Sequence, residues 1–138
     1  MLVLDAPIIP GDSAAGLRIG TSIEDVLVHE KPNATVPLHG AIKYDFGPIH
    51  LWVANGSIFQ IGVFAGYRGS LRSGIKIGST IGEIQQAIGA VTEDEEDNLV
   101  VPGYPGWCFE TEEWLEGHQP EQNPKARVTE IYVYRPAV

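Results

Sequence analysis

Carboxylates crowd one stretch in the second half of this chain. Between Thr92 and Glu121 the sequence has ten acidic residues and no lysine or arginine. A field of this sign repels phosphate backbones and anionic membranes, whereas it attracts basic proteins. Tyrosine and tryptophan, which often anchor protein interfaces, lie within the same stretch. The candidate partner-binding residues are therefore Glu93, Asp94, Glu95, Glu96, Asp97, Tyr104, Glu110, Glu112, Glu113, Trp114 and Glu116.

The charge of the whole chain supports the same choice of partner. The formal net charge is −9, of which residues 1–69 carry −2 and residues 70–138 carry −7. We therefore expect a basic protein as partner, and neither nucleic acid nor a membrane. The alternative is that the acidic stretch is solvated surface that only keeps the protein soluble.

Residues typical of catalytic or metal sites are sparse. The four histidines are scattered without the short spacings of a zinc site, and a single cysteine cannot complete one. The acidic run EDEEDN lacks the central glycine of an EF-hand loop. His50 and Cys108 fall on strands that align with each other, so a Cys108–His50 pair is the one catalytic hypothesis. Trp107 and Phe109 flank the cysteine, which favours a buried, inert thiol. We expect no enzymatic activity, no metal and no cofactor.

The length and composition indicate one soluble domain. The chain has 138 residues, of which 43% are hydrophobic, enough for one core. One cysteine cannot form an internal disulfide, and residues 1–12 lack the basic and apolar segments of a signal peptide. We therefore expect a cytoplasmic protein consisting of a single domain, 1–138, and favour a monomer.

Two short helices are indicated by a sequence segment that occurs twice. GLRIGTSIEDV at 16–26 recurs as GIKIGSTIGEI at 74–84, an offset of 58. Ser22 and Thr80 occupy matching positions, and each is followed three residues later by an acid, Asp25 or Glu83. This is the spacing of a capping box, so each phrase predicts the start of a short helix. Gly89 is expected to end the second helix.

Strand patterns follow each predicted helix. In the first half they cover 41–46, 46–53 and 57–64, with Asn55-Gly56 as a hairpin turn. In the second half they cover 98–101, 104–111 and 128–134, at an offset that grows to 70 because of a longer connection. Residues 2–6 could add another strand.

These elements predict an α+β fold. It comprises two tandem copies of a short helix followed by a three-strand antiparallel meander, about 16–64 and 74–134. Together they form one mostly antiparallel sheet with helices on one face.

The hairpin at Asn55-Gly56 also predicts which side chains share a face. One face should carry His50, Trp52, Phe59 and Ile61. The other should carry Leu51, Val53, Ile58 and Gln60. Neither set is polar, so the face away from the helices is either a binding surface or covered by other segments.

The tandem arrangement resembles β-lactamase inhibitory protein, and the motif G-x-x-I/L-G-x-[ST] is similar to that of small outer-membrane assembly lipoproteins. The chain also resembles the acidic immunity proteins encoded beside bacterial polymorphic toxins, both contact-dependent and type VI. The first two families imply disulfides or a lipid-modified cysteine, and this sequence has neither pattern.

The third resemblance implies a cytoplasmic immunity protein. Such a protein would bind a basic cognate toxin, for which a nuclease is one candidate, and occlude its active site. The alternatives are a small enzyme with a pocket between the repeats and a non-enzymatic assembly subunit.

Overall fold

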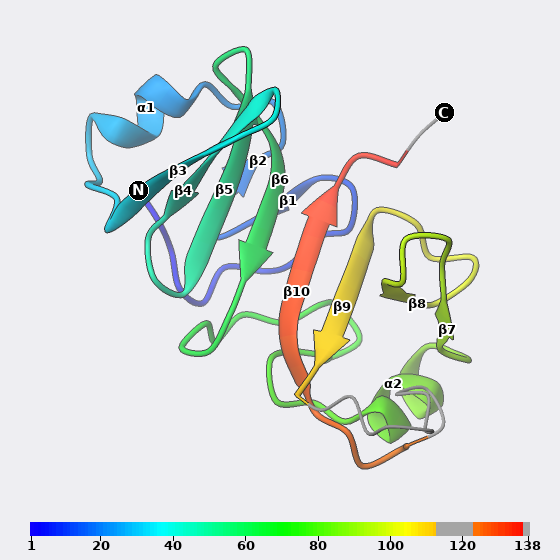
Figure 1. The fold of residues 1–138 in the computed structure, drawn as a ribbon. Coiled ribbons are helices and arrows are strands. Elements are labelled where there is room, and N and C mark those ends of the chain that lie inside the picture. Colours follow the sequence, from blue (N-terminus) through cyan, green and yellow to red (C-terminus); the bar gives the residue numbers. More distant parts are fainter. Residues whose placement is uncertain (113–122, 137–138) are drawn as a thin grey trace.

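The computed structural model describes residues 1–112 and 123–136 of the chain. These residues form an eight-stranded antiparallel sheet, a two-stranded hairpin and two short helices (Figure 1). The expected α+β class with a mostly antiparallel sheet is confirmed. In chain order the elements are β1 (Ser13–Ala14), β2 (Leu17–Arg18), α1 (Ile23–Leu27), β3 (Ala34–Leu38), β4 (Ala41–Asp45), β5 (Ile49–Ala54), β6 (Ser57–Val63), α2 (Ile81–Ala87), β7 (Thr92–Glu93), β8 (Leu99–Val100), β9 (Trp107–Thr111) and β10 (Val128–Tyr134).

The strand order of the large sheet is β3-β4-β5-β6-β10-β9-β8-β7. Strands that follow one helix are therefore neighbours, and the two sets meet where β6 pairs with β10 (Figure 1). Within the described residues each helix is followed by four strands, whereas the sequence pattern predicted about three. The two strands that the sequence pattern missed, β3 and β7, are the edge strands of the large sheet. β3 is exposed along its whole length and contains Pro37, a residue that sheets accept mainly at edges, and β7 has only two residues.

The N-terminal segment does not form the additional strand that its sequence suggested. Residues 2–6 contain no strand, although the Val3 N–H donates to the Ala15 carbonyl at 2.9 Å. Leu2 and Leu4 are partly buried against the core. The alternation of apolar residues in this short segment therefore reflects the packing of Leu2 and Leu4 against the core, and not strand pairing.

Both helices begin at the predicted residues. Thr80 accepts from the Glu83 backbone N–H while the Glu83 carboxylate accepts from the Thr80 N–H, which is the complete capping box. Ser22 makes a simpler cap, in which its hydroxyl accepts from the Glu24 N–H at 3.3 Å. Neither helix exceeds seven residues, so tertiary packing must stabilise both. Among the described residues, no helix has the length and apolar character that crossing a bilayer requires.

The tight hairpin predicted at Asn55-Gly56 is present. Both residues have positive φ, 52° and 78°, between the paired residues Ala54 and Ser57. This is the backbone of a type I′ turn, which matches the right-handed twist of the strands it joins. Glycine at the second position adopts this φ without steric cost.

The core lies between one face of the sheet and the two helices. Ile23 and Val26 from α1, and Ile81 and Ile84 from α2, join the same apolar cluster. The fully buried side chains that the large sheet contributes to it include Ile49, Leu51, Ile58, Ile61, Val63, Trp107, Phe109 and Ile131. Burying one such side chain stabilises the fold by about 1.5–3 kcal/mol.

A bulge in β6 changes the predicted faces of the hairpin. Val53 pairs with Ile58 but Trp52 pairs with Gln60, so Phe59 is an extra residue. Ile61 therefore joins the buried face, where it pairs with Leu51, and Gln60 moves to the opposite face. The predicted grouping of Trp52 with Ile61 is wrong for this reason, because simple alternation assumes an unbroken ladder.

Candidate functional site

The face of the large sheet opposite the core carries a concentration of aromatic side chains, and we call it the open face. Its residues are partly exposed along the central strands, in contrast to the buried core face. The strand register brings them into rows that cross the sheet. One row is His50, Gly62, Tyr132 and Cys108, and the next is Trp52, Gln60 and Tyr134.

Four rings on the open face contact one another, and we call them the aromatic cluster: His50, Trp52, Phe64 and Tyr132. Trp52 and Tyr132 meet edge to face, with ring centroids 5.7 Å apart and planes at 71°. Phe64 meets Tyr132 in the same way at 5.9 Å and 87°. His50 lies 4.2 Å from Phe64. Such contacts stabilise ring orientations by about 0.5–1.5 kcal/mol each, so the cluster is preorganised.

Gly62 makes room for these rings. A Cβ atom on Gly62 would lie 2.9 Å from Cζ3 of Trp52 and 3.1 Å from Cε1 of Phe64. The six-membered ring of Trp52 therefore lies over the Gly62 backbone, in space that any other residue would occupy. Gly62 does not have a positive φ, so space rather than backbone conformation requires a glycine here.

Beside the aromatic cluster is an open cleft with a volume of about 520 Å³, within the range typical of ligand sites. It spans the junction of β6 and β10 and extends to the turn between β7 and β8. Its lining combines aromatic, amide and carboxylate side chains: Trp52, Gln60, Asp94, Glu96, Asn98, Cys108, Glu110, Tyr132, Tyr134 and Arg135.

The turn between β7 and β8 is ordered by one carboxylate oxygen. Oδ1 of Asp94 accepts from the backbone N–H groups of Glu96 and Asn98, both at 2.9 Å. Asp97 has a φ of 64°, the left-handed conformation that Asp and Asn tolerate in turns. The turn thus places Asp94 and Glu96 at the cleft while most of its other side chains face solvent.

Three carboxyl groups, those of Asp94, Glu96 and Glu110, line the cleft. Glu110 and Glu130 are direct partners across β9 and β10. Partial burial and a hydrogen bond to Glu130 raise the pKa of the Glu110 carboxyl, and the Glu130 charge adds to this. The Tyr132 hydroxyl donates to Oε1 of Glu130 at 2.5 Å. Burial first, and then Glu130, raise the pKa of Tyr132 far above its ordinary value.

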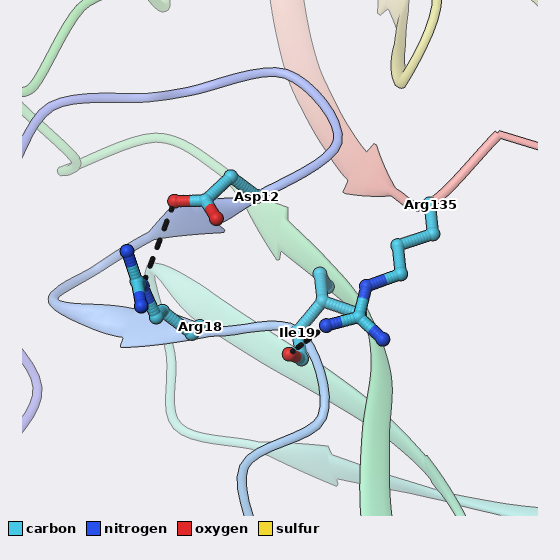
Figure 2. A network of polar contacts seen from close by, with 4 residues as sticks. All are labelled: Asp12, Arg18, Ile19 and Arg135. Atoms are coloured by element: carbon cyan, nitrogen blue, oxygen red, sulfur yellow. Dashed lines mark hydrogen bonds and ion pairs between the residues drawn. The ribbon is translucent and has the colours of Figure 1, made fainter.

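One guanidinium lies at the margin of the cleft. Arg135 extends from the end of β10 and donates through Nη2 to the carbonyl of Ile19 at 3.0 Å (Figure 2). This bond ties β10 to the segment that precedes α1. The ion pair between Arg18 and Asp12 in the same view joins Nε to Oδ2 at 3.8 Å; the Arg18 side chain is exposed and that of Asp12 is partly exposed.

The structure does not assemble the hypothesised Cys108–His50 pair. The two residues share a row, but β6 and β10 lie between their strands. Three strand spacings amount to about 14 Å, too far for proton transfer. Burial, followed by the charges of neighbouring carboxylates, raises the pKa of the Cys108 thiol to about 12, which opposes thiolate formation. His50 instead places Nε2 3.1 Å from Oδ1 of Asp45, and burial lowers its pKa. Within residues 1–112 and 123–136, no cluster of acids, histidines and cysteine could hold a metal ion.

The structure brings three predicted partner-binding residues together. Asp94, Glu96 and Glu110 line the same cleft, although Glu110 lies far from the other two in the sequence. Glu93 precedes the turn on β7 and is partly exposed. Glu95 and Asp97 are exposed on the turn itself.

Other predicted residues lie elsewhere. Tyr104 is 52% exposed, but it borders a separate hollow of about 210 Å³ that is also lined by Trp107 and Leu71. The Glu112 carboxylate accepts from the Arg127 backbone N–H at 3.3 Å. Glu113, Trp114 and Glu116 lie outside the described residues.

Sequence reasoning missed the aromatic part of the cleft. Trp52 lies on β5, far in the chain from Tyr132 and Tyr134 on β10, so no local motif contains all three. A signal was present in β10, where Tyr132 and Tyr134 alternate with the buried residues Ile131 and Val133. Aromatic residues on the partly exposed side of a strand are typical of a binding face.

Comparison with known proteins shows the fold of the chain and no more than the fold. No protein-family model and no curated protein matches the sequence. Its structure resembles the uncharacterized protein YfeY from Escherichia coli, with a TM-score of 0.58, 17% identity and coverage of 97% of this chain and 99% of that one. It also resembles a cysteine-rich secretory protein, SAV1118, from Staphylococcus aureus, with a TM-score of 0.52, 11% identity and coverage of 96% of this chain and 49% of the other.

Proposed function

We propose that this chain is a cytoplasmic immunity protein that binds a basic cognate toxin and neutralises it by occluding the toxin's active site. The observation that carries the proposal is the cleft on the open face, where Asp94, Glu96 and Glu110 share the lining with aromatic side chains. Aromatic anchors supply contact area with little loss of conformational freedom, and the carboxylates select a partner of opposite charge.

The charge of the chain supports the same partner class. A net charge of −9, concentrated in the half that bears the turn and β9, steers a cationic protein toward the cleft. Enzymes that act on nucleic acids must themselves present positive charge to phosphates. An acidic surface that covers such an active site excludes the substrate, so a nuclease is one candidate for the toxin.

We also propose that the fold arose by internal duplication. Backbone hydrogen bonds between the segment that begins each helix and the beginning of its last strand, or the residue just before that strand, support this because they recur at the two sequence offsets. The matching pairs are Gly20 N–H to Ile58 O and Gly78 N–H to Val128 O, and Ile23 N–H to Gly56 O and Ile81 N–H to Ala126 O. Each copy would be a helix and a four-strand meander. The cleft spans β6 and β10, the last strands of the two copies, so it requires both.

Co-expression with the product of the adjacent gene tests the proposed function. We expect rescue of growth and a complex that co-purifies and weakens as salt is raised, because screening shortens the reach of exposed charges. The absence of both rescue and complex would refute the proposal for that pair.

Charge-neutralising variants test the site within the same experiment. Glu96→Gln combined with Glu110→Gln should slow association about threefold to tenfold at low salt. Glu24→Gln combined with Asp25→Asn on α1 is the matched control, since it replaces two exposed carboxylates on a helix that packs on the core face. Equal association rates for both variants would show that the partner binds elsewhere.

A further inference from the structure

We propose that the cleft is a receptor for one arginine side chain, which the basic partner inserts over Trp52 and between the carboxylates of the β7–β8 turn and β9. This inference rests on the proposed function and adds the chemical identity of the anchoring group. It follows from the shape and lining of the cleft, in three steps.

The first step is the aromatic surface. Trp52 lines the cleft, and its orientation is set by the backbone of Gly62 beneath it and the edge contact with Tyr132. A planar guanidinium stacks on an indole face with little loss of hydration, whereas an ammonium is more strongly hydrated and cannot stack. The preorganised Trp52 ring therefore favours arginine over lysine.

The second step is the arrangement of acceptors. Glu96 lies at the turn and Glu110 on β9, so carboxylates border the cleft from two different elements. Oδ1 of Asp94 is already used by two backbone N–H groups of the turn. Glu130 accepts from the Tyr132 hydroxyl and is hydrogen-bonded to Glu110. The exposed Glu96 and the remaining lone pairs of Glu110 are therefore the acceptors proposed for an incoming group. A guanidinium has five N–H donors on two edges and can serve two carboxylates at once.

The third step concerns the position of Arg135. Arg135 is the one cation among the described residues that line the cleft, and its guanidinium donates to the carbonyl of Ile19 (Figure 2). Repulsion from Arg135 directs a second guanidinium to the side of the cleft formed by Glu96 and Glu110. Removing the Arg135 charge should therefore strengthen binding of the arginine side chain.

A titration followed by ¹H–¹⁵N NMR tests this inference without the partner protein. The probe is Nα-acetylarginine methylamide, with the neutral isostere Nα-acetylcitrulline methylamide and the lysine analogue as comparisons. We expect saturable shifts at millimolar probe concentrations in the Trp52 indole N–H and in the amides of residues 94–98. The citrulline probe should give none, and the lysine probe should bind more weakly than the arginine probe.

Variants locate the site within the cleft. Trp52→Leu should weaken arginine binding about threefold to tenfold through loss of the cation–π contact. Glu96→Gln, at an exposed position that does not threaten folding, should weaken it about twofold to fivefold. Arg135→Gln should strengthen it about twofold. Phe59→Leu and Glu24→Gln are the controls, because both residues are exposed and lie outside the cleft.

Equal shifts with arginine and citrulline, shifts away from the cleft, or no saturable shift would overturn the inference. Unchanged affinity in both Trp52→Leu and Glu96→Gln would do the same. Failure of the titration would leave the co-purification result intact, so the arginine receptor can fail while the immunity function stands. Conversely, saturable binding of the arginine probe at the cleft, with no growth rescue and no co-purifying toxin, would show that the cleft binds arginine but that the chain is not an immunity protein for that toxin.

Discussion

Replacement of Gly62 by alanine should disorganise the open face while leaving the backbone unstrained. Gly62 lies in the middle of β6 without a positive φ, so alanine can adopt its conformation. The new Cβ would lie 2.9 Å from Trp52 and 3.1 Å from Phe64, and both distances are shorter than an ordinary van der Waals contact. The Trp52 ring must therefore move, and its edge contact with Tyr132 must change.

The expected loss of stability is modest because Trp52 is only partly buried. Overpacking of a well-packed site costs about 1–3 kcal/mol, and a ring that can tilt toward solvent places this site near the lower end. Alanine also restricts the unfolded chain more than glycine does, which offsets about 0.4–1 kcal/mol of this loss. The net loss in the free energy of unfolding is about 1 kcal/mol, which for 138 residues corresponds to a fall in Tm of roughly 3 °C.

Urea denaturation, near-ultraviolet circular dichroism and arginine-probe binding together measure this effect. Gly62→Ala should lower the urea midpoint, alter the aromatic signal and weaken probe binding about threefold to tenfold. Gly89→Ala is the matched control, because its Cβ would meet only Cγ1 of Val101 at an ordinary 3.6 Å. A Gly62→Ala variant as stable as Gly89→Ala, with unchanged aromatic signal and probe binding, would refute the role assigned to Gly62.

Three further perturbations follow from other parts of the structure. Tyr67→Phe removes a hydroxyl that accepts from the Ala15 N–H at 2.9 Å and donates to the Ala6 carbonyl at 2.6 Å, so the free energy of unfolding should fall by about 2–4 kcal/mol. Tyr104→Phe, at an exposed ring, is the control and should change it by less than about 0.5 kcal/mol in the same urea titration. The pKa of Glu110 is raised in the folded protein, so its protonated form stabilises the fold below the unfolded pKa of 4.5, and this stabilisation is lost as pH rises through the folded pKa. Glu110→Gln should therefore gain unfolding free energy relative to wild type between about pH 4 and pH 7, by less than about 1 kcal/mol. A difference that stays constant with pH would contradict the coupling to Glu130. The Cys108 thiol should react with iodoacetamide at least about a hundredfold more slowly in the native protein than in urea, and equal rates would exclude the buried, neutral thiol.

Local signals in the sequence were sufficient for the helix starts and the central hairpin. Ser22 and Thr80 cap helices because a hydroxyl at that position can accept from the first unpaired N–H groups, which is a property of a few adjacent residues. The turn at Asn55-Gly56 forms for a similar reason, since both residues tolerate positive φ.

The features that could not be predicted depend on contacts between distant segments. The bulge at Phe59 is visible only once the register of β5 against β6 is known, and it exchanges the faces of every residue that follows it. Edge strands such as β3 lack a buried face, so they have no apolar alternation to detect. The cleft joins Trp52 and Tyr132, which become neighbours only because β6 pairs with β10.

The acidic half of the site was predictable from composition, and its geometry was not. The ten carboxylates between Thr92 and Glu121 are the basis for proposing a basic partner, and they are visible in the sequence whatever their arrangement in space. Which of them act together depends on the turn held by Asp94 and on the pairing of β8 with β9, which brings Glu96 and Glu110 to one cleft.

Hydrogen–deuterium exchange of the chain, alone and mixed with the product of the adjacent gene, tests the proposed binding face most directly. We expect slowed exchange in residues 94–99, 107–111 and 128–135, which form the β7–β8 turn and the strands beneath the cleft. Protection confined to residues 23–27 and 81–87, the helices on the core face, with unchanged exchange around the cleft, would contradict it.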